Sequence, residues 1–592
     1  MSAISGYVER HRNGRARDEL TVWFDAPASE ACTVDCRSRD EDPCPAVRIE
    51  ADVRLDNRAE LLARLSLPGV SVLSDASLIL CAWKKWGRAC PNYLVGDFAF
   101  AIWDPHQRSV FCARDHIGAR PFHYAIMRDR FAFASDIRSV LAAPGVSDAL
   151  DDAYVAATLL DRMYMSNDRT YYAAIRKLPP GHSLTLRADG ERLERYWHPS
   201  QSPDVRFAAP ADYAAAAREI FRQAVRDRLA TQDNVGVHLS GGLDSSSVAV
   251  MVAREQRAVG KRAPIALSWQ PPPDAESMMS WEHTCIDAVA RREGLPVHYC
   301  PMNPGDVLEM LRKDPTREPV TSTMIIEATT QRCAAALGIR VILSGFGGDE
   351  GLSSKGNGYS AELLVRGRWN ALYRESRRRH DKPLKHIAAE ALLLLFPDRD
   401  TASNRLAARR WRTPYRAAQW MQADFLRRAT PLRSLPSRQA SVRSSLVWWW
   451  ENGYLTERME SWAFHGRPHG LSYAYPLLDR RLLEFVAGLP SEQLARGPSP
   501  RAFMRRVTEG ILPVEFAAMP DKPSDIVRTT PAFGVARRAL ALAGEQLAAL
   551  PSAPLRACYV NVANLLPRLR PEALEGSVRL GDLLRTVQFL DF

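Results

Sequence analysis

The chain has 592 residues, of which 46% are apolar and 25% are charged, and its formal net charge is +11. This composition is typical of a soluble globular protein, and the length suffices for two or three domains with separate cores. The sequence contains no apolar run near the roughly 20 residues of a membrane helix, and its start lacks the apolar core of a signal peptide. We therefore expect a cytoplasmic protein without a membrane partner.

The cysteines and the positive charge bear on two further classes of protein. Only Cys32, Cys36 and Cys44 lie close together in the chain, and no C-x-x-C pair occurs. This spacing indicates neither a zinc site nor a disulfide framework. Arginines concentrate in the C-terminal half, as at 374–380 and 405–416, without a recognisable nucleic-acid-binding module. We expect solvated helix faces there, and no nucleic-acid partner.

The first third of the chain alternates short strands with turns. Apolar and β-branched runs predict strands at 47–52, 98–103, 110–113, 123–126 and 130–134. Helical spacing of apolar residues predicts a helix at 75–86. The polar, proline-containing segment 201–210 has the composition of a linker. We therefore predict one domain over 1–200 and a second over 201–592.

After the linker, predicted strands alternate with predicted helices. The helices are expected at 211–229, 245–260, 282–292 and 325–337, and the strands at 235–239, 264–269, 297–300 and around Val341. This alternation is typical of a parallel sheet covered by helices on both faces. In such sheets, ligands bind beyond the carboxyl ends of the strands.

A glycine-rich turn follows the strand at 235–239. Ser240, Gly241 and Gly242 separate this strand from the next helix. Glycines let the backbone approach a ligand closely, and the N–H groups at a helix start favour bound phosphate. Asp244 lies in the same turn, which makes chemical sense if Mg²⁺ lies between it and the phosphate. The turn lacks the lysine of a Walker A loop.

A second turn of the same kind lies at 340–350, with the sequence RVILSGFGGDE. It again joins a strand, glycines and a carboxylate, that of Asp349. Because both turns directly follow strands of the predicted sheet, they can converge on one nucleotide.

These two motifs carry a resemblance. SGGLDSS resembles the pyrophosphatase loop (PP-loop) of ATP pyrophosphatases, and 340–350 resembles the second signature of the asparagine synthetase family. The resemblance implies ATP and Mg²⁺ as cofactors, with Asp244 and Asp349 as catalytic residues and metal ligands. It also implies that Lys522, in Asp521-Lys-Pro523, stabilises charge at the α-phosphate. The implied ATP-binding residues are Leu239, Ser240, Gly241, Gly242, Leu243, Asp244, Ser245, Ser268, Trp269, Ser344, Gly345, Phe346 and Gly347.

The first 200 residues resemble the glutaminase half of glutamine-dependent asparagine synthetase, in segments such as 95–104 and 113–121. That domain is an Ntn-type αββα sandwich in which an N-terminal cysteine attacks glutamine. Here Ser2 follows Met1, and the Asn-Gly-Glu stretch of the family is not recognisable near 51–54. A hydroxyl without an activating base is a poor nucleophile. We therefore expect an inactive, glutaminase-like scaffold.

Segments 460–465 and 469–485 resemble the substrate side of the family, which implies that His469, Tyr473 and Asp479 contact the substrate. Phe346 stands where asparagine synthetase has glutamate and β-lactam synthetase has tyrosine. Phenylalanine cannot accept a proton. If the reaction needs a base, the candidates are Glu350, His465 and His469.

Among members of the family, the chain is most similar to the lasso peptide cyclases, which form isopeptide bonds. The resemblance implies adenylation of an Asp or Glu side chain in a leader-cleaved core peptide, followed by attack of its N-terminal amine. The implied partners are this peptide, a leader peptidase and a leader-binding protein. Trp448, Trp449 and Trp450 could line an apolar groove for a peptide or pack in a core. A β-lactam synthetase-like or asparagine synthetase-like small-molecule ligase is the alternative.

Overall fold

The computed structural model describes residues 4–11, 19–24, 47–67, 73–160, 166–229, 234–272, 280–321, 323–379, 381–395, 419–429, 439–496, 500–516, 531–575 and 580–591. Within these ranges, every helix is too short or too polar to cross a membrane.

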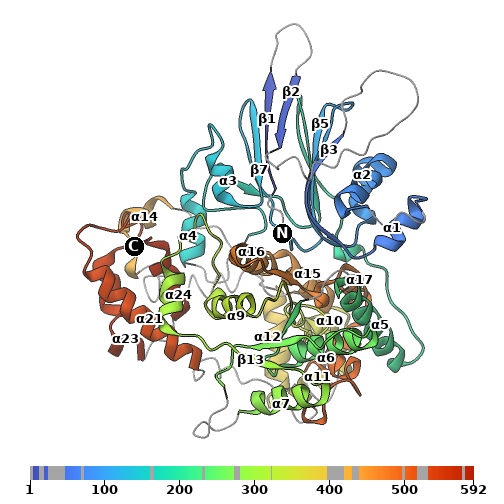
Figure 1. Cartoon of the computed structure of the whole chain (residues 1–592). Helices are drawn as coiled ribbons and strands as arrows, with labels where there is room; N and C mark the ends of the chain where they lie inside the picture. Colours follow the sequence, from blue (N-terminus) through green and yellow to red (C-terminus); the bar gives the residue numbers. More distant parts are fainter. Residues whose placement is uncertain are drawn as a thin grey trace, which may run out of the picture.

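Two five-stranded antiparallel sheets form the N-terminal part of the molecule (Figure 1). The first has the order β2-β1-β7-β6-β8, with β1 Ser5–His11, β2 Glu19–Phe24, β6 His123–Ile126, β7 Arg130–Ala134 and β8 Arg176–Lys177. The second has the order β10-β9-β5-β4-β3, with β3 Arg48–Leu55, β4 Gly96–Asp104, β5 Ser109–Arg114, β9 His182–Arg187 and β10 Gly190–Arg195.

Apolar side chains from both sheets fill the space between them, among them Val8, Phe131 and Leu184. Helices α1 (Arg58–Arg64) and α2 (Asp75–Trp86) cover the outer face of the second sheet, and α3 (Ile137–Ala142) covers the first. The predicted four-layer αββα sandwich is therefore confirmed. The helix predicted at 75–86 has the predicted bounds, and Ser74 caps its start by accepting a hydrogen bond from the amide of Ser77.

The second part of the chain contains the predicted parallel sheet, which has five strands in the order β13-β12-β11-β14-β15. Its strands are β11 Val235–His238, β12 Ile265–Ser268, β13 Val297–Tyr299, β14 Val341–Leu343 and β15 Ser472–Ala474. The sequence did not predict β15. This strand is three residues long and pairs with β14, which lies more than a hundred residues earlier in the chain. No local sequence pattern therefore indicates it.

Helices α5 (Pro210–Leu229), α6 (Leu243–Ala258) and α7 (Trp281–Glu293) pack together on one side of this sheet (Figure 1). Helices α9 (Met324–Ala336) and α16 (Tyr454–Gly466) pack on the other. The remaining helices are α4 Asp152–Leu160, α8 Pro304–Leu311, α10 Tyr359–Val365, α11 Trp369–Arg379, α12 Pro383–Leu395, α14 Ala423–Arg428, α15 Val442–Glu451, α17 Arg480–Gly488, α18 Ser491–Ala495, α19 Ala502–Val507, α21 Pro531–Ala548, α22 Val562–Leu565, α23 Pro571–Glu575 and α24 Leu580–Phe589. Short 3₁₀ helices include η4 Arg467–His469 and η5 Pro476–Leu478.

A buried ion-pair cluster joins the sandwich to the second part of the chain. Arg114 on β5 donates a hydrogen bond to Glu460 on α16 at 2.8 Å, and Lys177 on β8 lies 2.9 Å from the same carboxylate. Burial opposes ionisation of Glu460, but Lys177 and Arg114 outweigh it and lower the pKa of Glu460 to about 2. The carboxylate therefore stays charged and holds α16, which borders the site described next, against the sandwich.

Candidate active site

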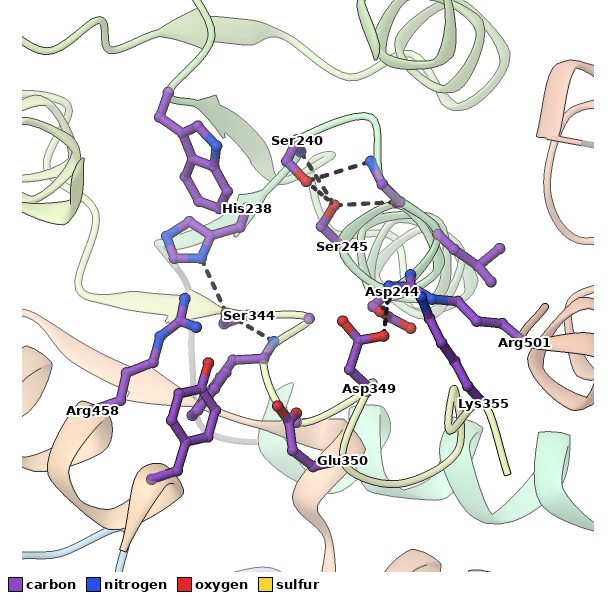
Figure 2. A pocket seen from close by; sticks show the side chains of 18 of the residues that line it. His238, Ser240, Asp244, Ser245, Ser344, Asp349, Glu350, Lys355, Arg458 and Arg501 are labelled. Atoms are coloured by element: carbon purple, nitrogen blue, oxygen red, sulfur yellow. Dashed lines mark hydrogen bonds and ion pairs between the residues drawn. The ribbon is translucent and has the colours of Figure 1, made fainter. Parts of the chain in front are cut away.

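A pocket lies where β11 and β14 end, and both glycine-rich turns line it (Figure 2). The lining residues are His238, Ser240, Gly242, Leu243, Asp244, Ser245, Trp269, Ser344, Gly345, Phe346, Gly347, Gly348, Asp349, Glu350, Lys355, Tyr454, Arg458, Arg501 and Arg505. Ser240 of the first predicted motif and Asp349 of the second thus border one cavity.

The first turn has the geometry that its glycines predict. Gly241 has a φ of +73°, and a Cβ at this position would lie 2.4 Å from the carbonyl oxygen of Glu282 on α7. Only glycine satisfies both demands. The Oγ atoms of Ser240 and Ser245 lie 2.8 Å apart and fix the turn across its mouth. Helix α6 therefore starts at the pocket, and the positive end of its dipole is directed toward it.

The second turn packs directly on the first. A Cβ at Gly345 would lie 2.4 Å from the backbone nitrogen of Ser245, and one at Gly348 would lie 2.4 Å from Cγ of Asp244. Real Cβ atoms do not approach other atoms this closely, so these two glycines permit the contact. The two turns form one continuous surface around the start of α6.

Two carboxylates of the pocket share one arginine. Arg501 lies 3.4 Å from Asp244 Oδ2 through Nη1 and 2.5 Å from Asp349 Oδ1 through Nη2 (Figure 2). Its own backbone has a φ of +59°, an uncommon conformation for a residue with a side chain. Two carboxylates that line one pocket are hard oxygen donors, and this donor set fits Mg²⁺.

The pocket holds further positive charge, from Lys355, Arg458 and Arg505. The guanidinium of Arg458 lies over the ring of Phe346, 4.1 Å from its centroid, and 4.4 Å from that of Trp462. Phe346 cannot act as a base, but its ring face attracts the cation and holds it at the pocket.

Glu350 is the one base candidate of the sequence that lines the pocket. Its side chain is buried, and the indole of Trp450 donates a hydrogen bond to its backbone oxygen at 2.8 Å. Burial, followed by the nearby charge of Asp349, raises the pKa of Glu350 to about 7. A carboxyl group with this pKa exchanges protons readily near neutral pH. His465 and His469 lie outside the pocket, and burial lowers the pKa of His465 to about 4.

A buried hydrogen-bond chain supports the second turn from behind. His238 Nδ1 lies 3.1 Å from Ser344 Oγ, and its Nε2 lies 3.1 Å from Glu327 Oε1. The hydroxyl of Tyr473 donates to the same Glu327 oxygen at 2.6 Å. Tyr473 is therefore buried behind the pocket, away from its lining. This position corrects the expectation that Tyr473 contacts the substrate.

Asp479 and His469 also lie outside the pocket lining. Asp479 is buried at the start of α17, where Arg228 lies 2.7 Å and Arg481 2.9 Å from its Oδ2 atom. Burial opposes the charge of Asp479, but the arginines outweigh it and lower its pKa. The carboxylate is thus committed to holding α17 against α5, which corrects its assignment to the substrate. His469 lies in η4, also away from the pocket.

The remaining predicted residues lie in different places. Trp269 lines the pocket. Leu239 and Ser268 are fully buried and do not line it, and Gly241 forms the bend of the first turn without lining it. Lys522 lies outside the described residues. The three consecutive tryptophans lie on α15, where Trp448 and Trp450 are buried, and none lines the pocket. Of the two readings of this run, the structure favours core packing.

Sequence reasoning gave no role of their own to seven residues that line the pocket: His238, Gly348, Lys355, Tyr454, Arg458, Arg501 and Arg505. Most come from segments without a glycine-rich signature. Arg501 carried a usable signal, because the segment 501–506 combines three arginines with a helix start.

Comparisons with known proteins find matches for both parts of the chain. A family model described as asparagine synthase matches residues 216–557, more than half of the chain, and one described as a glutamine amidotransferase domain matches 56–197. An asparagine synthetase (glutamine-hydrolyzing) of Bacillus subtilis is 32% identical over 193 residues, which cover 32% of this chain and 30% of that protein. The amidase chyE of Penicillium rubens is 31% identical over 185 residues, covering 30% and 26%.

A probable asparagine synthetase of Schizosaccharomyces pombe is 27% identical over 298 residues, which cover 47% of each chain. The aligned part thus spans less than a third of the first two relatives and about half of the third. The family model extends over both glycine-rich turns and over Arg501, the residues that meet in the pocket. This chain belongs to the asparagine synthetase family.

Proposed function

We propose that this protein is an ATP-dependent, AMP-forming carbon–nitrogen ligase that closes a peptide ring, as lasso peptide cyclases do. The observation that carries the ligase proposal is the contact between the two glycine-rich turns. They place a helix N-terminus, two carboxylates and several cations around one cavity. These groups complement a triphosphate with its metal.

The chemistry has two steps. In the first, a carboxylate oxygen of the substrate attacks the α-phosphorus of ATP, the bond from that phosphorus to the bridging oxygen breaks, and pyrophosphate leaves. In the second, an amine nitrogen attacks the acyl carbon, the bond to AMP breaks, and the nitrogen loses a proton. The products are an amide, AMP and pyrophosphate.

Several charged residues of the pocket have a place in the first step. The start of α6 and the side chain of Lys355 lie at the cavity where phosphate oxygens would bind, and Arg505 adds a further positive charge to its lining. Asp244 and Asp349 would hold Mg²⁺, which neutralises charge on the leaving pyrophosphate. Arg458, held on Phe346, would add positive charge to the cavity in which the reaction takes place. Lys522 is a further candidate on the grounds of the family resemblance.

Glu350 is the candidate base for the second step. It lines the pocket, it is buried, and Trp450 fixes its backbone. The α-amine at a peptide N-terminus has an unperturbed pKa of about 8, so a fraction of this amine is already neutral near pH 7. Glu350 then needs only to accept the proton that the nitrogen releases as the amide forms.

One feature supports an amine source other than glutamine. The stretch near 51–54 lacks the Asn-Gly-Glu with which the family binds glutamine. In the structure, Arg54 of this stretch forms ion pairs within the sandwich, at 2.9 Å from both Asp56 and Asp97. The sandwich then acts as a scaffold, and the substrate supplies its own amine. A leader peptidase and a leader-binding protein are the proposed partners.

The test uses the full-length protein with Mg-ATP and a leader-free peptide from the reading frame adjoining this gene. Ring closure predicts pyrophosphate, AMP and a peptide lighter by one water, with its N-terminal amine blocked. Release of pyrophosphate only with a small amino-acid substrate would favour a β-lactam synthetase-like ligase instead. Formation of asparagine from aspartate and ammonia would favour the asparagine synthetase-like alternative. No pyrophosphate with any carboxylate would contradict the ligase itself.

A further inference from the structure

Three metal-ligating side chains meet outside the active-site pocket. His298 lies on β13, Cys300 follows directly after that strand, and Cys333 lies on α9. One ring nitrogen of His298 and the two Sγ atoms all lie within 4.8 Å of one another. None of the three lines the pocket that we assign to ATP.

We propose that His298, Cys300 and Cys333 bind a thiophilic divalent cation, with zinc as the best match. Two thiolates and an imidazole are typical protein ligands of zinc. Zn–S bonds of about 2.3 Å in a tetrahedron place two sulfurs about 3.8 Å apart, so the two Sγ atoms, which lie within 4.8 Å of each other, would need to close by at most about 1 Å. His298 is exposed, so water completes the fourth position.

Zinc binding releases protons from the two thiols. The two S–H bonds break, two Zn–S bonds and one Zn–N bond form, and two protons pass to the solvent. The histidine binds through a neutral ring nitrogen. No electron is transferred, so the site needs neither an oxidant nor a reductant.

The position of this site suggests a structural role. β13 is the edge strand of the parallel sheet, and the amide of Cys300 donates to the carbonyl oxygen of Ser268 at the end of β12. Cys333 lies on α9, the helix that also carries Glu327 of the chain behind the pocket. A bound ion would therefore connect the end of β13, the edge strand, to α9, the helix that supports the second turn. The neighbouring strand β12 ends one residue before Trp269.

The sequence spacing indicated no zinc site because the ligands do not follow a paired-cysteine pattern. Cys300 and Cys333 are 33 residues apart, and only folding brings α9 back to the end of β13. The short His-x-Cys element at 298–300 is too common in sequences to signal a metal by itself.

The experiment titrates reduced, metal-free, full-length protein with zinc against a chromophoric chelator, and with cobalt followed by absorbance. We expect one zinc per chain and a thiolate-to-cobalt charge-transfer band. His298→Asn, an exposed change that leaves the core intact, should weaken zinc binding at least ~10-fold. Cys333→Ser should abolish the charge-transfer band or weaken it strongly. Cys285→Ser, at a buried cysteine outside the group, is the matched control and should bind as the wild type does.

Two results would overturn the proposal. One is equal zinc affinity in the wild type, His298→Asn and Cys333→Ser, or no stoichiometric binding at all. The other is a Cys300–Cys333 disulfide in freshly isolated protein, found by peptide mapping without bound metal. Because the assay measures metal directly, neither result depends on ligase activity.

Discussion

The backbone at Gly348 packs against the side chain of Asp244, so closely that a Cβ at Gly348 would lie 2.4 Å from Asp244 Cγ. These residues belong to turns that follow different strands of the parallel sheet. Their contact makes the position of the first carboxylate depend on the second turn, and it fixes the distance between the two turns. Both motifs, which lie about a hundred residues apart in the chain, are therefore needed to form the pocket.

Gly348→Ala tests this dependence. The added methyl group displaces Asp244, and a displacement on the order of 1 Å can cost about 100-fold in rate. We expect such a loss in ATP–pyrophosphate exchange, with an unchanged circular dichroism spectrum. Gly534→Ala, in helix α21, is the matched control, because a Cβ there has no atom within 4 Å. Exchange at the wild-type rate in Gly348→Ala would show that the contact is dispensable.

Phe346→Leu should release Arg458 from its position at the pocket. A cation–π contact is worth about 0.5–2 kcal/mol, which corresponds to a fall in kcat of about 2- to 30-fold. Phe346→Tyr keeps the ring face and should keep most of the rate. Steady-state pyrophosphate release measures both variants. An equal effect of leucine and tyrosine would exclude this role for the ring.

Glu350→Gln should separate the two half-reactions. Glutamine keeps the size of the side chain but cannot accept a proton, so amide formation should fall by about 10²–10⁴-fold. Adenylation does not need this proton transfer, and ATP–pyrophosphate exchange should persist. Single-turnover mass spectrometry follows the ring product, and isotope exchange follows the first step. Loss of both activities together would place Glu350 in adenylation instead.

His123 should make the fold sensitive to acid. Burial lowers the pKa of His123 to about 4, although Glu460 acts in the opposite direction. The unfolded chain binds this proton near pH 6.5, whereas the folded chain does not until about pH 4. Stability is thus complete above pH 6.5 and falls by up to about 3 kcal/mol as the pH drops to 4.

Urea unfolding at several pH values measures this effect. His123→Asn removes the titrating group, and its free energy of unfolding should depend less on pH between 6.5 and 4. His106→Asn, at an exposed position between β4 and β5, serves as the control and should follow the wild type. The same pH slope in His123→Asn and the wild type would contradict this explanation.

Elements with a strong local pattern could be predicted from the sequence. The helix at 75–86 has a capping serine and regular apolar spacing. The strands at 123–126 and 130–134 are joined by a short turn and pair with each other. Their predicted bounds are confirmed because local forces define them. β15 has three residues and depends on β14 for its hydrogen bonds, so its sequence alone carries too little information.

The candidate site divides in the same way. The glycine-rich turns were visible because glycine is required where backbones meet, as at Gly345. Arg501 was not assigned, because its arginine-rich segment indicates positive charge but does not show that this side chain reaches both carboxylates. The prediction for Tyr473 failed for a related reason. A family resemblance places a segment near the substrate, but the strand decides that this hydroxyl points to Glu327.

The most direct test of the shared ATP site is calorimetric titration of the full-length protein with Mg²⁺ and α,β-methylene-ATP, which cannot be cleaved at the α-phosphate. The wild type should bind one nucleotide per chain. Asp244→Ala in the first turn and Asp349→Ala in the second should each weaken binding at least ~10-fold, since both carboxylates belong to one site. Wild-type affinity in both variants would contradict the central claim that the two turns enclose a single nucleotide.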